Sequence, residues 1–134
     1  MERVLVVGGI RIPSFSGIQV VRFESPLMEL SHLVAQEYST VVVDLPSNTN
    51  PISKFYLDQV LEWIHRFQVL ESGTPVIVVA RENSIELERR IRKEGVFYYL
   101  CGEPEPNNWK EILNLSFAYS TSRRTNETYL SLAS

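Results

Sequence analysis

Short runs of β-branched residues recur along the chain and are separated by longer stretches in which apolar residues follow helical spacing. Nearly continuous Val and Ile content is typical of strands that are buried on both faces of a parallel sheet. The second run is less uniformly apolar, because it contains Gln19 and Arg22. The pattern predicts five strands, at Val4–Val7, Ile18–Phe23, Thr40–Asp44, Pro75–Ala80 and Val96–Leu100.

Four of the intervening and following stretches repeat apolar residues every three or four positions, as an amphipathic helix does. The second of them has a clear start, since Asn50 can cap a helix and Pro51 suits the first helical position. Capping boxes at Asn83–Glu86 and Asn108–Glu111 predict where the last two begin. We therefore expect helices at 27–38, 51–72, 83–95 and 108–120.

The connection between the first two strands has no helical pattern, because residues 8–17 contain Pro13 and small side chains. An antiparallel hairpin is the obvious alternative. However, the helix at 27–38 leads almost directly into the strand at Thr40, which keeps strand 18–23 parallel to strand 4–7. Ten extended residues reach about 33 Å, and a six-residue strand is only about 20 Å long. We expect an α/β fold with a doubly wound, five-stranded parallel sheet and a loop at 8–17 in place of the first helix.

The composition fits one globular domain of 134 residues, with 44% hydrophobic and 22% charged residues. A net charge of −3 argues against general attraction to nucleic acid or to an anionic membrane. The single Cys101 excludes an internal disulfide, and His32 and His65 lack partners at metal-binding spacing. No apolar run is long enough for a signal peptide or a membrane span, so we expect a cytoplasmic protein. A domain at 1–120 and a polar tail or linker at 121–134 are predicted.

Several segments resemble a response-regulator receiver domain. They are Thr-Pro-Val-Ile-Val-Val-Ala from Thr74, the helix ending at Gly95, Gly-Val-Phe-Tyr-Tyr-Leu-Cys-Gly-Glu-Pro from Gly95, Arg-Val-Leu-Val-Val from Arg3, and Val-Val-Val-Asp-Leu-Pro from Val41. The resemblance covers about residues 3–120. It implies a flavodoxin-like strand order 2-1-3-4-5, with the functional site at the carboxyl edge of the sheet.

Receivers carry five residues for phosphoryl transfer at that edge. An acidic pair after the first strand and an Asp ending the third strand hold Mg²⁺, and this Asp attacks phosphorus. A hydroxyl residue and a Lys contact the phosphoryl oxygens. Asp44 matches the phosphoacceptor, whereas Gly8, Gly9, Ala80 and Gly102 stand at the other four positions. We therefore expect a degenerate site, with no metal, no cofactor and no phosphorylation at Asp44.

The resemblance also implies a surface for protein contacts. Tyr99 matches the aromatic position whose rotamer reports activation in receivers, and the helix before it helps to form the surface that meets output partners. From the residues alone, the charged run Glu86–Glu94 is most simply a solvated helix face. The candidate interface residues are Arg89, Arg90, Lys93, Tyr99, Trp109 and Phe117.

Replacing the first helix with a loop would leave only the 108–120 helix on one face of the sheet. Apolar loop residues such as Ile10, Ile12 and Phe15 would cover part of that face. Exposed apolar area beyond a few hundred Å² usually marks an interface. We expect the rest of the face to be buried in a homodimer or against a larger partner.

These features predict a non-catalytic pseudo-receiver that acts by protein–protein contact in signalling or transcriptional regulation, either alone or attached to an output domain. Direct contact with nucleic acid or a membrane is not expected. One alternative is a nucleotide or small-molecule sensor that uses the cleft around Gly8, Asp44 and Gly102. A second is an atypical receiver that is phosphorylated with unconventional metal ligands, for which Glu103 and Glu105 are the only nearby acids.

Overall fold

The computed structural model describes residues 2–23, 38–45, 51–70, 73–81 and 84–133, with side chains left out at 51–56 and beyond Ser120. All five predicted strands are confirmed, with ends within two residues of the expected ones. The predicted helix at 27–38 lies almost wholly outside the described residues. The elements are β1 (Glu2–Val7), β2 (Ile18–Phe23), β3 (Thr40–Asp44), α2 (Pro51–Leu70), β4 (Val76–Ala80), α3 (Ile85–Arg92), β5 (Tyr98–Cys101) and α4 (Pro106–Ala133).

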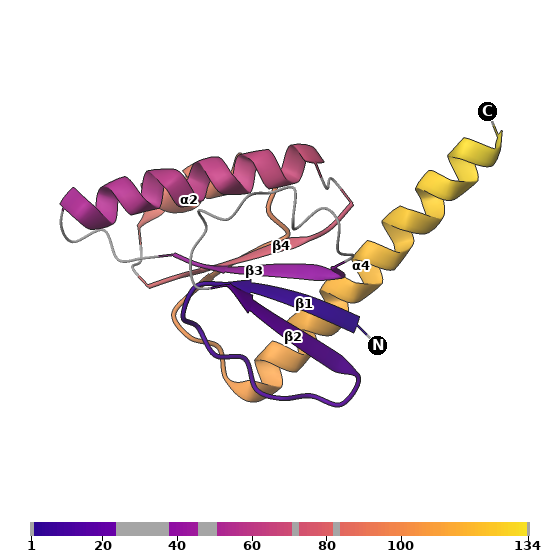
Figure 1. The fold of residues 1–134 in the computed structure, drawn as a ribbon, viewed down its shortest axis with the longest axis horizontal. Helices are drawn as coiled ribbons and strands as arrows, with labels where there is room; N and C mark the ends of the chain where they lie inside the picture. Colours follow the sequence, from indigo (N-terminus) through magenta and orange to yellow (C-terminus); the bar gives the residue numbers. More distant parts are fainter. Residues whose placement is uncertain (1, 24–37, 46–50, 71–72, 82–83, 134) are drawn as a thin grey trace.

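The five strands form one sheet in the order β2-β1-β3-β4-β5, and every neighbouring pair is parallel. This confirms the predicted doubly wound order. α2 covers one face of the sheet and α4 the other (Figure 1). Because both faces are covered, β4 is buried throughout its length and β3 as far as Val43, which explains their continuous Val and Ile content.

The loop at 8–17 crosses from β1 to β2 without a helix, as predicted, and it also fills the space that a helix would occupy. Ile10 is 6% exposed, and Ile12 and Phe15 pack with it against the core on the α4 face. Val4 and Val6 in β1 consequently have no exposed surface. The expectation that this face would stay partly open is therefore wrong for the central strands, and an uncovered face no longer argues for a homodimer.

Three helix ends differ from the predictions. The N-cap of α3 is Ser84, whose hydroxyl accepts a hydrogen bond from the Leu87 amide at 3.3 Å, rather than Asn83. α3 also ends at Arg92, three residues before Gly95. α4 begins at Pro106, with the Trp109 amide donating to the Glu105 carbonyl at 3.0 Å, so Asn108 already lies inside the helix. Proline suits this first position because its missing N–H would have no partner there.

α4 continues through Ala133, although the apolar periodicity ends near Tyr119. Ser120 is the last buried side chain that is described on α4, and the final turns extend away from the sheet (Figure 1). The residues expected to form an irregular polar tail are therefore helical. None of the helices in the described residues is long and apolar enough to cross a bilayer.

Candidate functional site: a charged pocket at the carboxyl edge of the sheet

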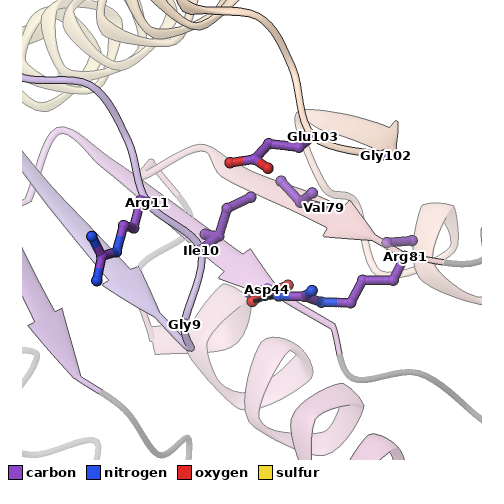
Figure 2. A pocket seen from close by; sticks show the side chains of 9 residues that line it. Gly9, Ile10, Arg11, Asp44, Val79, Arg81, Gly102 and Glu103 are labelled. Atoms are coloured by element: carbon purple, nitrogen blue, oxygen red, sulfur yellow. Dashed lines mark hydrogen bonds and ion pairs between the residues drawn. The ribbon is translucent and has the colours of Figure 1, made fainter.

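A pocket of about 250 Å³ lies where the carboxyl ends of the central strands meet. This is the edge at which open α/β sheets usually bind their ligands. The pocket brings together four of the five positions that correspond to the phosphoryl-transfer residues of receivers, namely Gly9, Asp44, Ala80 and Gly102. The fifth, Gly8, does not line the pocket but packs against Asp44. The pocket is lined by Gly9, Ile10, Arg11, Asp44, Val79, Ala80, Arg81, Gly102 and Glu103 (Figure 2).

Asp44 is held by an ion pair with Arg81, the residue that follows β4. A guanidinium nitrogen of Arg81 (Nη2) lies 2.9 Å from Asp44 Oδ2. The side chain of Asp44 is only 7% exposed, whereas that of Arg81 is 59% exposed. The hydrogen bond to Asp44 and the charge of Asp44 raise the pKa of Arg81 above its usual value. The carboxylate is therefore already neutralised by a cation that belongs to the chain itself.

The second carboxylate oxygen of Asp44, Oδ1, is buried and accepts no hydrogen bond within the described part of the chain. An unpaired buried carboxylate oxygen is costly, which makes the Arg81 contact to the other oxygen more important. Arg81 was not predicted from the sequence, because its contact with Asp44 depends on the register of β3 and β4. In that register Asp44 is level with Val79, and Arg81 follows two residues later.

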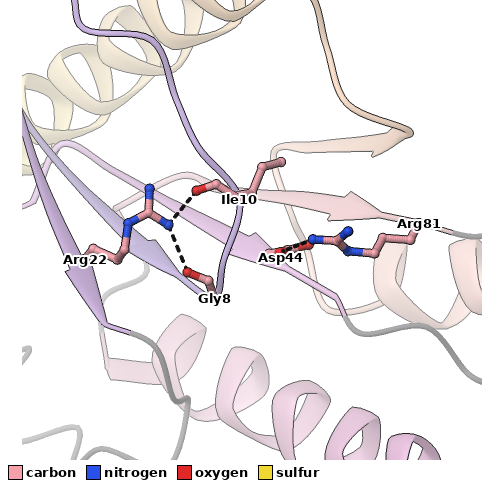
Figure 3. Close-up of polar contacts among 5 residues, drawn as sticks. All are labelled: Gly8, Ile10, Arg22, Asp44 and Arg81. Carbon is pink, nitrogen blue, oxygen red and sulfur yellow. Dashed lines mark hydrogen bonds and ion pairs between the residues drawn. The ribbon is translucent and has the colours of Figure 1, made fainter.

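Gly8 is required by the close approach of β1 to Asp44. Its φ of +114° suits glycine alone, and a Cβ at this position would lie 2.7 Å from the Asp44 Cβ. The Arg22 guanidinium fixes the turn by donating to the carbonyls of Gly8 and Ile10, at 3.0 and 2.5 Å (Figure 3). An acidic side chain at position 8 would therefore need a shift of the backbone.

No family model matches the chain, and no curated protein matches it in sequence. Solved structures match its fold closely. A CheY-like response regulator receiver domain from Methanospirillum hungatei superposes with a TM-score of 0.73, at 15% identity, over 91% of this chain and 98% of that one. The chain has the receiver fold.

Two further matches carry this fold in other settings. A structure from Rhodopirellula baltica named as an adenylate cyclase gives a TM-score of 0.74 at 16% identity and covers 97% of both chains. NtrX from Brucella abortus, crystallised with ADP, gives 0.74 at 13% identity over 95% of this chain. The match spans only 30% of the NtrX chain, so the receiver fold there is one part of a longer protein.

The residues of this receiver fold do not fit the Mg²⁺ site of the family. Mg²⁺ needs several oxygen ligands in near-octahedral geometry. Gly8 and Gly9 provide no carboxylate, and Asp44 is engaged by Arg81. Among the described residues, Glu103 is the one other acid that lines the pocket. Across the residues with described side chains, no group of three or more His, Cys, Asp or Glu is placed to hold a metal.

Tyr99, which the sequence analysis matched to the switch-like aromatic position of receivers, packs in the core and is 9% exposed. Its hydroxyl has no hydrogen-bond partner among the described residues, and burial raises the pKa of its phenol. The Arg92 guanidinium lies over the ring, 6.0 Å from its centre. Tyr99 is therefore available to a partner only if it leaves this buried position.

The predicted interface residues divide into two groups. Arg89, Arg90 and Lys93 are exposed on α3 or at its C-cap, as an interface requires. Trp109 and Phe117 are 1% and 8% exposed and pack in the core between α4 and the sheet. They are therefore structural, and this part of the predicted interface is corrected.

Sequence analysis missed the apolar residues that β5 and α4 do present to solvent. Tyr98 is 43% exposed, Leu115 is 53% exposed and Tyr119 is 40% exposed. Tyr98 and Leu115 line a second pocket of about 380 Å³ between β5 and α4. The helical spacing that buries Leu113 and Phe117 leaves Leu115 on the opposite side of α4, and Tyr98 alternates with the buried Tyr99 along β5.

Proposed function

We propose that this chain is a non-catalytic receiver module that acts through protein contacts and is not phosphorylated at Asp44. The observation that carries the proposal is the ion pair between Asp44 and Arg81. It engages one of the two carboxylate oxygens of Asp44 and places a positive guanidinium beside the carboxylate that would otherwise accept a phosphoryl group.

Several features of the pocket support the absence of phosphoryl transfer. The transferring group develops charge that must be neutralised by a metal ion and by positive or hydrogen-bonding side chains. Ala80 has no hydroxyl group, and Gly102 has no amine. Because Gly8 lies against the Asp44 Cβ, position 8 is closed to a second carboxylate, and Gly9 provides none.

The contact surface that we propose centres on α3 and β5. Arg89 and Lys93 are exposed, and neither makes an ion pair within the described residues, whereas Arg90 pairs with Asp58 at 3.2 Å. Cations on α3 that make no ion pair within the described residues favour a partner with acidic groups, and the exposed ring of Tyr98 on β5 offers an apolar contact on the side that faces α4. This surface replaces the predicted set that included Trp109 and Phe117.

The partner is either a separate protein or an output domain that continues from the chain. The match to a minor part of NtrX supports the second arrangement, because there the receiver fold is attached to further domains. The continuation of α4 through Ala133 supports it too, because a helix fixes the orientation of an attached domain relative to the sheet more rigidly than a flexible tail does. We propose a domain boundary near residue 120, where the apolar helical spacing of α4 ends.

Acetyl phosphate with Mg²⁺ tests this proposal, with intact-mass spectrometry as the readout. We expect no added phosphoryl mass under conditions that modify a receiver with all five residues, treated in parallel. A mass gain of one phosphoryl group that disappears in Asp44→Asn would overturn the proposal and favour the atypical phosphorylated receiver.

A further inference from the structure

We propose that the pocket beside the Asp44–Arg81 ion pair binds a small zwitterion, such as an α-amino acid with a short aliphatic side chain. This goes beyond the proposed protein contacts and does not depend on which partner is bound. The inference is drawn from the lining of the pocket, which places a guanidinium and a carboxylate around an apolar surface.

Arg81 supplies the site for the negative end of the ligand. Its guanidinium has five N–H donors, and one nitrogen contacts Asp44 at 2.9 Å. The side chain is 59% exposed, so further donors remain accessible to a ligand. The nearly buried Asp44 holds the group in a defined position, and a planar guanidinium matches a carboxylate in two parallel hydrogen bonds. Arg81 is thus prepared to bind a carboxylate without losing its internal partner.

Glu103 supplies the site for the positive end. It lies after β5, is exposed, and turns its carboxylate over the pocket on the side away from Asp44 (Figure 2). No ion pair joins Glu103 to Arg81, although the charge of Glu103 contributes to the raised pKa of Arg81. The two charges are therefore near each other without contact, and one molecule with an ammonium and a carboxylate group can satisfy both.

The surface between these charges is apolar. Figure 2 shows the Ile10 side chain pointing into the pocket, opposite Val79 on β4. Ile10 is held in place because Arg22 donates a hydrogen bond to its carbonyl. The volume of about 250 Å³ is below the usual range of about 300–1,000 Å³ for sites that hold drug-sized molecules. A short alkyl chain fits these walls better than a nucleotide does.

Titration of the ¹⁵N-labelled chain with L-valine, followed by ¹H–¹⁵N correlation spectra, tests the proposal. We expect saturable shifts of the Gly9, Arg81 and Gly102 amides at millimolar valine. Isobutylamine and isovalerate are valine without its carboxylate and without its ammonium group, so each should bind at least about tenfold more weakly, a loss of about 1.4 kcal/mol or more. Glu103→Gln should weaken valine binding, whereas Glu105→Gln, an equal change two residues away and outside the pocket lining, should not.

Three outcomes would overturn the proposal. The first is the absence of saturable shifts at these three amides up to about 20 mM valine, a concentration at which even a millimolar site would be largely filled. The second is equal binding of valine and either half-ligand, which would remove the need for two charges. The third is that MgCl₂ shifts the amides and valine does not, which would assign the pocket to a metal ion.

Discussion

Gly8 and Asp44 are in such close contact that a Cβ added to Gly8 would lie 2.7 Å from the Asp44 Cβ and 3.3 Å from its carbonyl oxygen. Gly8 also has a φ of +114°. The first of the two positions at which receivers carry an acidic pair is therefore closed in this chain by packing as well as by sequence. The absence of an acidic side chain at position 8 therefore goes with the close packing of the ends of β1 and β3.

Gly8→Ala should lower the free energy of unfolding by about 2–3 kcal/mol, because it combines backbone strain with a steric clash. Gly17→Ala is the matched control, since Gly17 has a φ of +81° and no atom within 4 Å of an added Cβ. This control should lose only about 1 kcal/mol from strain. Urea unfolding of both variants measures the difference, and equal losses would show that the contact with Asp44 is unimportant.

Arg81→Ala should lower the free energy of unfolding by about 1–2 kcal/mol, because it leaves a nearly buried carboxylate without its partner. The exposure of Arg81 keeps this value below that of a fully buried pair. In a double-mutant cycle, Asp44→Asn should remove most of this loss. Additive effects of the two changes would contradict a direct interaction.

Tyr99 should make the chain less stable at alkaline pH. Burial raises the pKa of its phenol in the folded state, so the unfolded chain releases this proton first as the pH rises past about 10. The contribution of the neutral Tyr99 phenol to the free energy of unfolding is constant below that pH, and it becomes less favourable to folding as the pH rises above it. The loss between pH 8 and pH 11 should therefore be smaller in Tyr99→Phe than in the original chain, as urea unfolding at each pH will measure.

The same substitution should be neutral or slightly stabilising at pH 7, because the Tyr99 hydroxyl is buried without a partner among the described residues. Identical pH profiles for the two proteins would mean that other groups cause the alkaline loss. Tyr38 is the first to consider, since burial raises its pKa as well.

The sheet was predictable because its physical cause is local. Buried parallel strands need continuous Val and Ile runs, and the short step from residue 38 to Thr40 determines the chain direction. The Asp44–Arg81 pair was not predicted, because it depends on the register between β3 and β4, which neither strand specifies alone. α4 was predicted too short, since its last turns lack the apolar stripe by which a helix is recognised.

The start of α4 shows a signal that was present and misread. Pro106 favours the first helical position, whereas Asn108 and Glu111 fit a capping box that the structure does not use. The burial of Trp109 and Phe117 follows from the same helical stripe that predicted the helix. Their assignment to an interface came from the resemblance to receivers and not from their own spacing.

Binding of beryllofluoride, a mimic of the phosphoryl group, tests the central claim most directly. ¹⁹F spectra of the chain with Mg²⁺, beryllium and fluoride should contain no resonance from protein-bound fluoroberyllate, because Asp44 is paired with Arg81 and the described residues offer no set of metal ligands. A bound resonance in the original chain that is lost in Asp44→Asn would contradict the account.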